Sequence, residues 1–173
     1  YKDLDPSKDI QVLTPVRKGL LGCLNLNKEI QSIINPPHER LSEKKYGEKI
    51  FRENDKVMQI KNNYMLKWKK SDDFTEGEGV FNGDVGTIKK IDNDFNELTV
   101  EYDGNRYVVY DFSQLDELEP AYAVTVHKSQ GSEFPVVVIP VSWFPPVLST
   151  RNLLYTAVTR AKKAVIIVGS ETR

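Results

Sequence analysis

The residues best suited to chemistry lie in one polar turn between two apolar runs. The turn covers residues 125–133 and reads Thr-Val-His-Lys-Ser-Gln-Gly-Ser-Glu. His127, Lys128 and Gln130 carry hydrogen-bond donors, and backbone amides around Gly131 can approach a phosphate closely. We interpret the turn as a candidate phosphate-binding site. An ordinary helix cap or loop is the alternative.

Arg160 lies at the C-terminal end of a helix predicted over residues 151–163. Leu154, Val158 and Ala161 share one face of this helix. From the residue pattern alone, we interpret Arg160 as a helix-end cation that stabilises the helix dipole.

The elements that position these residues read as an α/β domain. Residues 136–139 and 164–169 are unbroken apolar runs, which predict strands of a parallel sheet buried on both faces. Residues 9–16 predict a further strand, followed by a helix over residues 19–35. Polar residues between such strands line the sheet edge, where ligands bind. Arg17 and Lys18, between this strand and helix, read as solvated charges that follow a strand.

The middle of the chain has a different pattern. Short strands are predicted at residues 56–60, 86–91, 98–102 and 106–110, and Asn-Gly-Asp and Asp-Gly-Asn turns separate some of them. Short strands at close spacing predict a small antiparallel barrel. Residues 38–47 read as a charged linker into this module, and residues 71–79 as a mobile loop.

Residues 61–70 mix four lysines with Tyr64 and Trp68. Bases stack on aromatic rings while cations meet phosphates, so one interpretation is a contact with single-stranded nucleic acid. The other is a barrel loop with solvated lysines and a packed tryptophan.

Composition excludes several classes of function. The 173 residues include 24 basic and 25 acidic side chains, so bulk charge does not hold this chain on nucleic acid, and any such contact is local. The single cysteine excludes an internal disulfide, and with two histidines we expect no metal site. No apolar run approaches a membrane span, and we expect a cytoplasmic protein.

The chain lacks a P-loop, because none of its ten glycines is followed by lysine. It begins at Tyr1 in the middle of a charged segment. We therefore expect a fragment of a longer protein.

Two stretches resemble motifs V and VI of superfamily one DNA helicases, namely HKSQGSEF at residues 127–134 and LLYTAVTRAKKAVIIVG at residues 153–169. The resemblance is to the RecD-like branch, which includes the alpha subunit of exodeoxyribonuclease V. Residues 12–31 (VLTPVRKGLLGCLNLNKEIQ) resemble its motif IV region, and Asn62-Asn63-Tyr64 matches its motif between IV and V.

The resemblance implies the fold and the domain limits. It implies an α/β, RecA-like second motor domain interrupted by an SH3-like antiparallel β-barrel. Residues 1–44 would be the first part of the RecA-like domain, residues 45–118 the barrel and residues 119–173 the second part.

The resemblance also implies roles for residues. Arg160 would be the arginine finger on the γ-phosphate, the catalytic residue. The other residues implied in nucleotide binding are Gly131, Glu133, Arg17 and Lys18. Single-stranded DNA would meet Thr125, His127, Lys128, Gln130, Asn63 and Tyr64. ATP and Mg²⁺ would act in the complete protein, with none expected on the fragment.

The function implied is the C-terminal part of an ATP-dependent DNA helicase, inactive without the P-loop domain. Its partners would be single-stranded DNA and the missing N-terminal RecA-like domain, and other exodeoxyribonuclease subunits stay open as partners. The alternative is a stand-alone SH3-like binding module on an α/β scaffold. The sequence upstream of Tyr1 discriminates between them, since a P-loop there favours the helicase.

Overall fold

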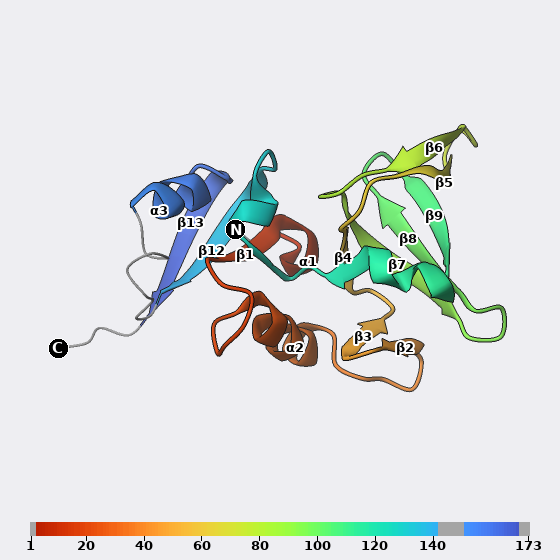
Figure 1. Cartoon of the computed structure of the whole chain (residues 1–173), viewed down its shortest axis with the longest axis horizontal. Helices are drawn as coiled ribbons and strands as arrows, with labels where there is room; N and C mark the ends of the chain where they lie inside the picture. Colours follow the sequence, from red (N-terminus) through yellow and green to blue (C-terminus); the bar gives the residue numbers. More distant parts are fainter. Residues whose placement is uncertain (1–2, 142–150, 170–173) are drawn as a thin grey trace. The chain divides into compact units, whose positions relative to one another are not determined.

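The computed structural model describes residues 3–141 and 151–169, and the chain divides into two compact units. Unit 1 combines residues 1–31 with residues 122–173, and unit 2 comprises residues 32–121. Each unit has its own main sheet (Figure 1). The division falls near residues 31 and 121, whereas the sequence places it near residues 44 and 118.

The sheet of unit 1 is parallel. Its strands lie in the order β11 (Ala123–Thr125), β1 (Ile10–Thr14), β12 (Phe134–Val141) and β13 (Ala161–Gly169). Within β1, Val12 lies opposite both Ala123 and Val138, so this strand is paired on both sides. The predicted parallel sheet is confirmed.

The two apolar strands of this sheet differ in burial. Val136 and Val137 of β12 are buried, as expected for a strand with neighbours on both sides and an unbroken apolar sequence. In β13, Ile166, Ile167 and Val168 are about half exposed, contrary to the prediction of full burial. Among the described residues β13 pairs only with β12, which makes it an edge strand and accounts for the difference.

Both helices predicted from the sequence are shorter in the structure, where they are α2 (Cys23–Ile34) and α3 (Arg151–Val158). A further short helix, α1 (Pro6–Asp9), was not predicted. The start of α2 is delayed because Gly19 has a positive φ of 92° and residues 19–22 form a turn. The end predicted for α3 at residue 163 is wrong. The carbonyl of Arg160 accepts a 2.8 Å bond from the Phe134 amide, so the chain has already joined the sheet there.

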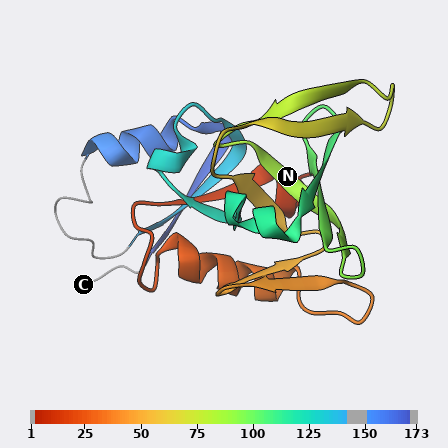
Figure 2. The same cartoon turned by 45° about the vertical axis from the view of Figure 1, so that its right-hand side comes forward.

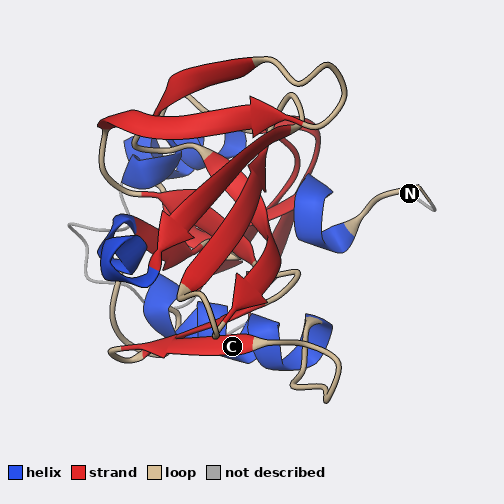
Figure 3. Ribbon diagram, turned by 90° about the vertical axis from the view of Figure 1, so that its right-hand side faces the viewer, coloured by secondary structure: helices blue, strands red, loops and turns tan. Residues whose placement is uncertain are grey.

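Unit 2 is almost entirely β-structure. The hairpin of β2 (Glu43–Tyr46) and β3 (Lys49–Arg52) precedes the main sheet. The main strands are β4 (Lys56–Gln59), β5 (Asn63–Lys70), β6 (Glu76–Val80), β7 (Val85–Asp92), β8 (Glu97–Tyr102), β9 (Arg106–Asp111) and β10 (Leu118–Pro120). They pair antiparallel in the order β10-β4-β7-β8-β9-β5-β6, and the 3₁₀-helix η1 (Phe112–Glu117) links β9 to β10. Figure 3 separates these strands by colour from the few helices.

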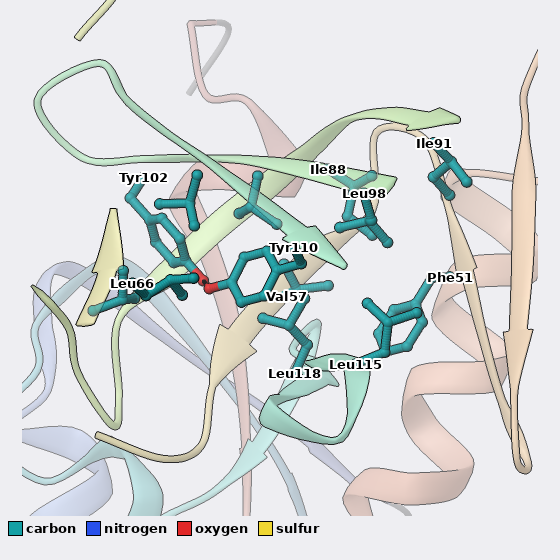
Figure 4. Close-up of a cluster of buried hydrophobic side chains, with 13 residues drawn as sticks. Phe51, Val57, Leu66, Ile88, Ile91, Leu98, Tyr102, Tyr110, Leu115 and Leu118 are labelled. Carbon is teal, nitrogen blue, oxygen red and sulfur yellow. Dashed lines mark hydrogen bonds between the residues drawn. The ribbon is translucent and has the colours of Figure 1, made fainter. Parts of the chain in front are cut away.

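One apolar core holds unit 2 together. Leu118 from one end of the strand order and Val80 from the other both belong to it, so the sheet curls around a single interior. Figure 4 shows this core, in which the Tyr102 and Tyr110 hydroxyls meet at 2.6 Å. The predicted α/β fold with an SH3-like insert is confirmed.

Three segments of unit 2 differ from the sequence reading. Residues 61–70, read as a loop or a ligand contact, contain the whole of strand β5, and residues 71–79 contain most of β6. The linker predicted at residues 38–47 contains β2. Figure 2 shows β5 and β6 as a long hairpin. Its pairing is helped by Gly77, where a Cβ would lie only 2.2 Å from the Trp68 ring.

The β2–β3 hairpin is anchored within unit 2 by buried polar groups. The guanidinium of Arg52 donates to the carbonyl of Asn35 at 2.6 Å and to Glu43 at 2.5 Å. The Asn35 side chain donates in turn to Asp55 at 2.8 Å. These bonds explain why residues from 32 onward group with the barrel.

Candidate functional site

The polar turn at residues 125–133 connects the two ends of the parallel sheet. Thr125 ends β11 and lies opposite Thr14, the last residue of β1. Phe134 begins β12, two residues before Val136, which pairs with Ile10 at the start of β1. Because the strands are parallel, the segment returns from the carboxyl edge of the sheet to its amino edge. One short segment therefore has residues at both edges.

Local hydrogen bonds fix the shape of this segment. The Val126 amide donates to the Thr14 carbonyl at 3.0 Å, and the Lys128 amide lies 3.4 Å from the Thr125 hydroxyl. Ser129 is fully buried and donates its hydroxyl to the Val126 carbonyl at 2.6 Å. These bonds shape the 3₁₀-helix η2 (His127–Ser129).

The candidate ligand-binding side chains of the segment face outward. His127, Lys128 and Gln130 are all exposed, while Val126 and Ser129 between them are buried. The buried residues hold the backbone, and the exposed ones present their donors at the surface. This division suits a binding turn better than a packed helix cap.

Arg160 lies beside the last residues of the same segment. Its Nη1 is 3.4 Å from the Ser132 carbonyl, although 28 residues separate the two in sequence. Its Nε is buried and has no hydrogen-bond partner among the described residues. A buried donor without an acceptor is costly, so this guanidinium is suited to donate a hydrogen bond to an anionic ligand.

The turn beside Arg160 has the geometry of a close-approach loop. Gly131 adopts a positive φ of 82° and its Cα faces open space, so a ligand could reach the backbone there. Glu133 is exposed and lies 3.3 Å from Lys162 Nζ. The sequence reading did not single out Lys162, because its contact with Glu133 depends on the pairing of Phe134 with Ala161 in the sheet.

Arg17 and Lys18 lie elsewhere on unit 1. They follow β1 at the carboxyl edge of the sheet and are exposed. Backbone bonds hold their loop, since the Leu24 amide donates to the Arg17 carbonyl at 3.2 Å. Arg160 instead precedes β13, at the amino edge. The structure thus brings Arg160, Gly131 and Glu133 together and separates them from Arg17 and Lys18.

Asn63 and Tyr64 belong to unit 2, at the start of β5. The side chain of Asn63 donates to both carboxylate oxygens of Glu117 at 3.1 Å. Tyr64 is 66% exposed and its ring meets the Phe81 ring edge to face. Phe81 and Glu117 were not singled out from the sequence. Phe81 follows strand β6, in which the glycines conceal the strand pattern.

Charged groups around Asn63 are mostly paired. Lys61 forms an ion pair with Asp116, and this hydrogen bond lowers the pKa of the Asp116 carboxyl. Within the described ranges, no group of three or more His, Cys, Asp or Glu side chains could hold a metal ion. Nor does any helix in those ranges have the length and apolarity to cross a membrane.

Two family models match the chain. Residues 26–102 match the SH3 domain of the ATP-dependent RecD-like DNA helicases, and residues 120–168 match the UvrD-like helicase C-terminal domain. Each family model matches a different sheet of the structure. The first covers most of the strands of the β-barrel, and the second covers β11, β12 and β13.

Curated relatives extend the match over almost the whole chain. The ATP-dependent RecD2 DNA helicase of Deinococcus radiodurans is 36% identical over 161 residues, which is 93% of this chain and 20% of that protein. The RecBCD enzyme subunit RecD of Haemophilus influenzae is 32% identical over 94% of this chain and 22% of its own length. The chain thus spans about a fifth of these relatives.

Solved structures share the fold. The Pif1 helicase from Bacteroides in complex with ADP-AlF3 and ssDNA matches with a TM-score of 0.57 and 19% identity, over 93% of this chain and 41% of that one. The Pif1 helicase from Candida albicans matches with a TM-score of 0.54 and 12% identity, over 97% and 47%. At these identities the likeness concerns the fold alone.

Proposed function

The chain belongs to the RecD-like DNA helicase family, and we propose that it serves as the second RecA-like motor domain of an ATP-dependent DNA helicase. In this role it closes over a nucleotide held by a P-loop domain elsewhere in the parent protein. The chain without that domain hydrolyses no ATP. The relatives named above, of which it matches about a fifth, support the proposal.

The observation that supports the nucleotide role most is the pairing of Arg160 with the glycine turn. We assign Arg160 to the γ-phosphate as an arginine finger, with Gly131 and Glu133 beside the nucleotide. Phosphoryl transfer depends on positioned positive charge, and a guanidinium supplies it without any proton transfer. The partnerless Nε of Arg160 fits a phosphate oxygen as its missing acceptor.

We also assign Arg17 and Lys18 to nucleotide binding. Because they lie at the carboxyl edge of the sheet, they would contact a phosphate apart from the one beside Arg160. Mg²⁺, which phosphoryl transfer uses to neutralise the phosphates, is assigned to the complete protein.

Single-stranded DNA is the second ligand. We assign Thr125, His127, Lys128 and Gln130 to its backbone and bases, and Asn63 and Tyr64 to a further contact on the barrel. Exposed donors on a fixed backbone suit phosphate and base contacts. His127 needs no catalytic proton transfer here, because a neutral imidazole already donates one hydrogen bond.

The proposal is tested by Arg160→Ala in the full-length parent protein. DNA-stimulated ATP turnover should fall by about 10³- to 10⁵-fold, the range typical of arginine fingers. Arg160→Lys should recover little of this loss, because an ammonium lacks the forked geometry of the guanidinium. The 173-residue chain on its own should show no turnover with either residue.

Arg151→Ala is the matched control, since Arg151 is an exposed arginine at the other end of α3. It should leave turnover nearly unchanged. Thermal melting of each variant checks the fold. Near-normal turnover of a folded Arg160→Ala protein would return Arg160 to the role of a helix-end cation.

A further inference from the structure

The barrel carries an exposed aromatic pair at one end of the β5–β6 hairpin. The Tyr64 and Phe81 ring centroids are 5.5 Å apart with an interplanar angle of 68°. Tyr64 is 66% and Phe81 42% exposed, although large aromatic rings usually bury most of their surface. In an edge-to-face pair each ring covers only part of the other, so flat aromatic surface stays open to a ligand.

Neighbouring polar groups hold the backbone of both rings. The Asn82 amide donates to the Asn62 side chain at 2.9 Å, which ties the two segments together. The Phe81 amide donates to Asp84 at 3.0 Å. Asn63 is held by Glu117, as described above. The pair is therefore fixed from both sides before any ligand arrives.

A glycine also sets the position of the Phe81 ring. Gly79 has a positive φ of 103°, and a Cβ at this residue would lie 2.9 Å from Phe81 Cζ. The ring thus rests on the bare Cα of Gly79. A preorganised ring loses little conformational entropy when a planar ligand stacks on it.

We propose that Tyr64 and Phe81 form a stacking platform for the unpaired bases of single-stranded DNA. The inference rests on the proposed function and adds to it Phe81 and the mode of contact. Every base has a π-face, so stacking on aromatic rings binds single strands with little regard to sequence.

The charges along β5 favour this occupant and predict how it binds. Lys61 and Lys69 are paired with Asp116 and Glu76, whereas Lys67 and Lys70 have no ion pair among the described residues. Of these two, Lys67 is the exposed one and suits a single backbone phosphate beside the stacked bases. Stacking, more than charge, then supplies the affinity, and its dependence on salt is shallow.

A proline-rich peptide is the competing occupant, because SH3 domains bind such peptides on aromatic-lined grooves. Lysines and asparagine amides next to the rings suit phosphates and base edges better than an uncharged peptide. The test therefore includes a proline-rich peptide as a second probe.

The experiment measures binding of the 173-residue chain to a single-stranded oligonucleotide that carries 2-aminopurine, whose fluorescence is quenched by stacking. Tyr64→Leu and Phe81→Leu keep apolar volume but remove the π-face. Each should weaken binding by about 5- to 100-fold and reduce the quenching, in line with the worth of one base stack. Phe95→Leu is the matched control, since Phe95 is exposed at the β7–β8 turn.

Salt dependence separates stacking from charge. The slope of log affinity against log salt should stay unchanged in both leucine variants. Lys67→Ala should reduce it by about 0.7, the value of one phosphate on a single strand. An oligonucleotide of abasic sites should bind the unsubstituted chain as weakly as the normal one binds Phe81→Leu.

Failure of the platform is distinguishable from failure of the proposed function. If His127→Ala and Lys128→Ala weaken binding while both leucine variants bind normally, the platform is wrong and the DNA role of residues 125–130 stands. If no variant changes binding, the proposed DNA contacts fail together. Binding of the proline-rich peptide, lost in Tyr64→Leu, without base quenching would overturn the stacking inference.

Discussion

Gln59→Leu is the substitution that best tests how the barrel supports its surface turns. Gln59 is fully buried in β4. Its side chain donates to the Lys61 carbonyl at 2.9 Å and to Glu117 at 2.8 Å, and it accepts from the Tyr110 hydroxyl at 2.8 Å. Glu117 in turn holds Asn63. One buried amide thus connects the core tyrosines to the Asn63 segment.

The expected cost follows from these bonds. Leucine fills nearly the same volume, so the loss of packing is small. An intramolecular hydrogen bond contributes about 0.5–1.5 kcal/mol net, and a buried group left unsatisfied costs about 1–3 kcal/mol. The Tyr110 hydroxyl keeps its contact with Tyr102, and Glu117 keeps Asn63. We therefore expect a loss of about 2–4 kcal/mol in the free energy of unfolding of unit 2.

Urea unfolding followed by circular dichroism measures this loss, and calorimetry should show the melting temperature of unit 2 lowered by roughly 10–25 °C. The double variant with Tyr110→Phe should cost at least about 1 kcal/mol less than the sum of the single variants, because each single variant already loses the Gln59–Tyr110 hydrogen bond and the double variant removes both of its ends. Gln130→Leu, at an exposed glutamine, should change stability by less than about 0.5 kcal/mol. A neutral Gln59→Leu variant, or strict additivity in the cycle, would refute the reasoning.

Two further predictions concern titratable groups of unit 2. Burial raises the pKa of Tyr102 and Tyr110 above the usual value of about 10, so above that pH the unfolded chain releases protons that the folded chain keeps. The free energy of unfolding should therefore fall as pH rises beyond about 10, and less steeply in Tyr102→Phe, as measured by urea unfolding between pH 8 and 11. Asp111 caps η1 by accepting from the Ser113 hydroxyl at 2.5 Å and from the Ser113 amide at 2.8 Å, and these two bonds lower the pKa of its carboxyl. Asp111→Ala should cost about 0.5–2 kcal/mol at neutral pH, and progressively less as pH falls from the ordinary aspartate pKa through the lowered pKa of the folded state, because the unfolded chain is protonated first and the native cap last.

The sequence predicted the strands that are rich in β-forming side chains and bounded by turn residues. Strands β7, β8 and β9 are rich in Val, Ile and Tyr and are separated by turns, so their pattern is visible locally. Strands β5 and β6 were missed because lysines and glycines dominate them. Their pairing depends on contacts across the hairpin, such as the Trp68 ring over Gly77, and propensity does not register such contacts.

The candidate site was predictable in content and less so in arrangement. Motif spacing indicated the turn at residues 125–133 and Arg160 as separate features. Their contact depends on the neighbouring positions of β12 and β13, which spacing along the chain does not reveal. The same limit applies to Arg17 and Lys18, which were grouped with the nucleotide residues although the sheet separates them from Arg160.

The register of the parallel sheet explains where Glu133, Arg160 and Thr125 lie. Phe134 pairs with Ala161, so β12 and β13 begin at the same level and the residues just before them, Glu133 and Arg160, become neighbours. Thr125 ends β11 at the opposite edge. Consecutive backbone bonds connect the turn beside Arg160 with the outward-facing side chains, from the Ser132 amide to the Ser129 carbonyl and from the Gln130 amide to the His127 carbonyl. Under the proposed function, a change at the nucleotide thus reaches the DNA-facing residues within one short segment, and coupling needs no longer path through the core.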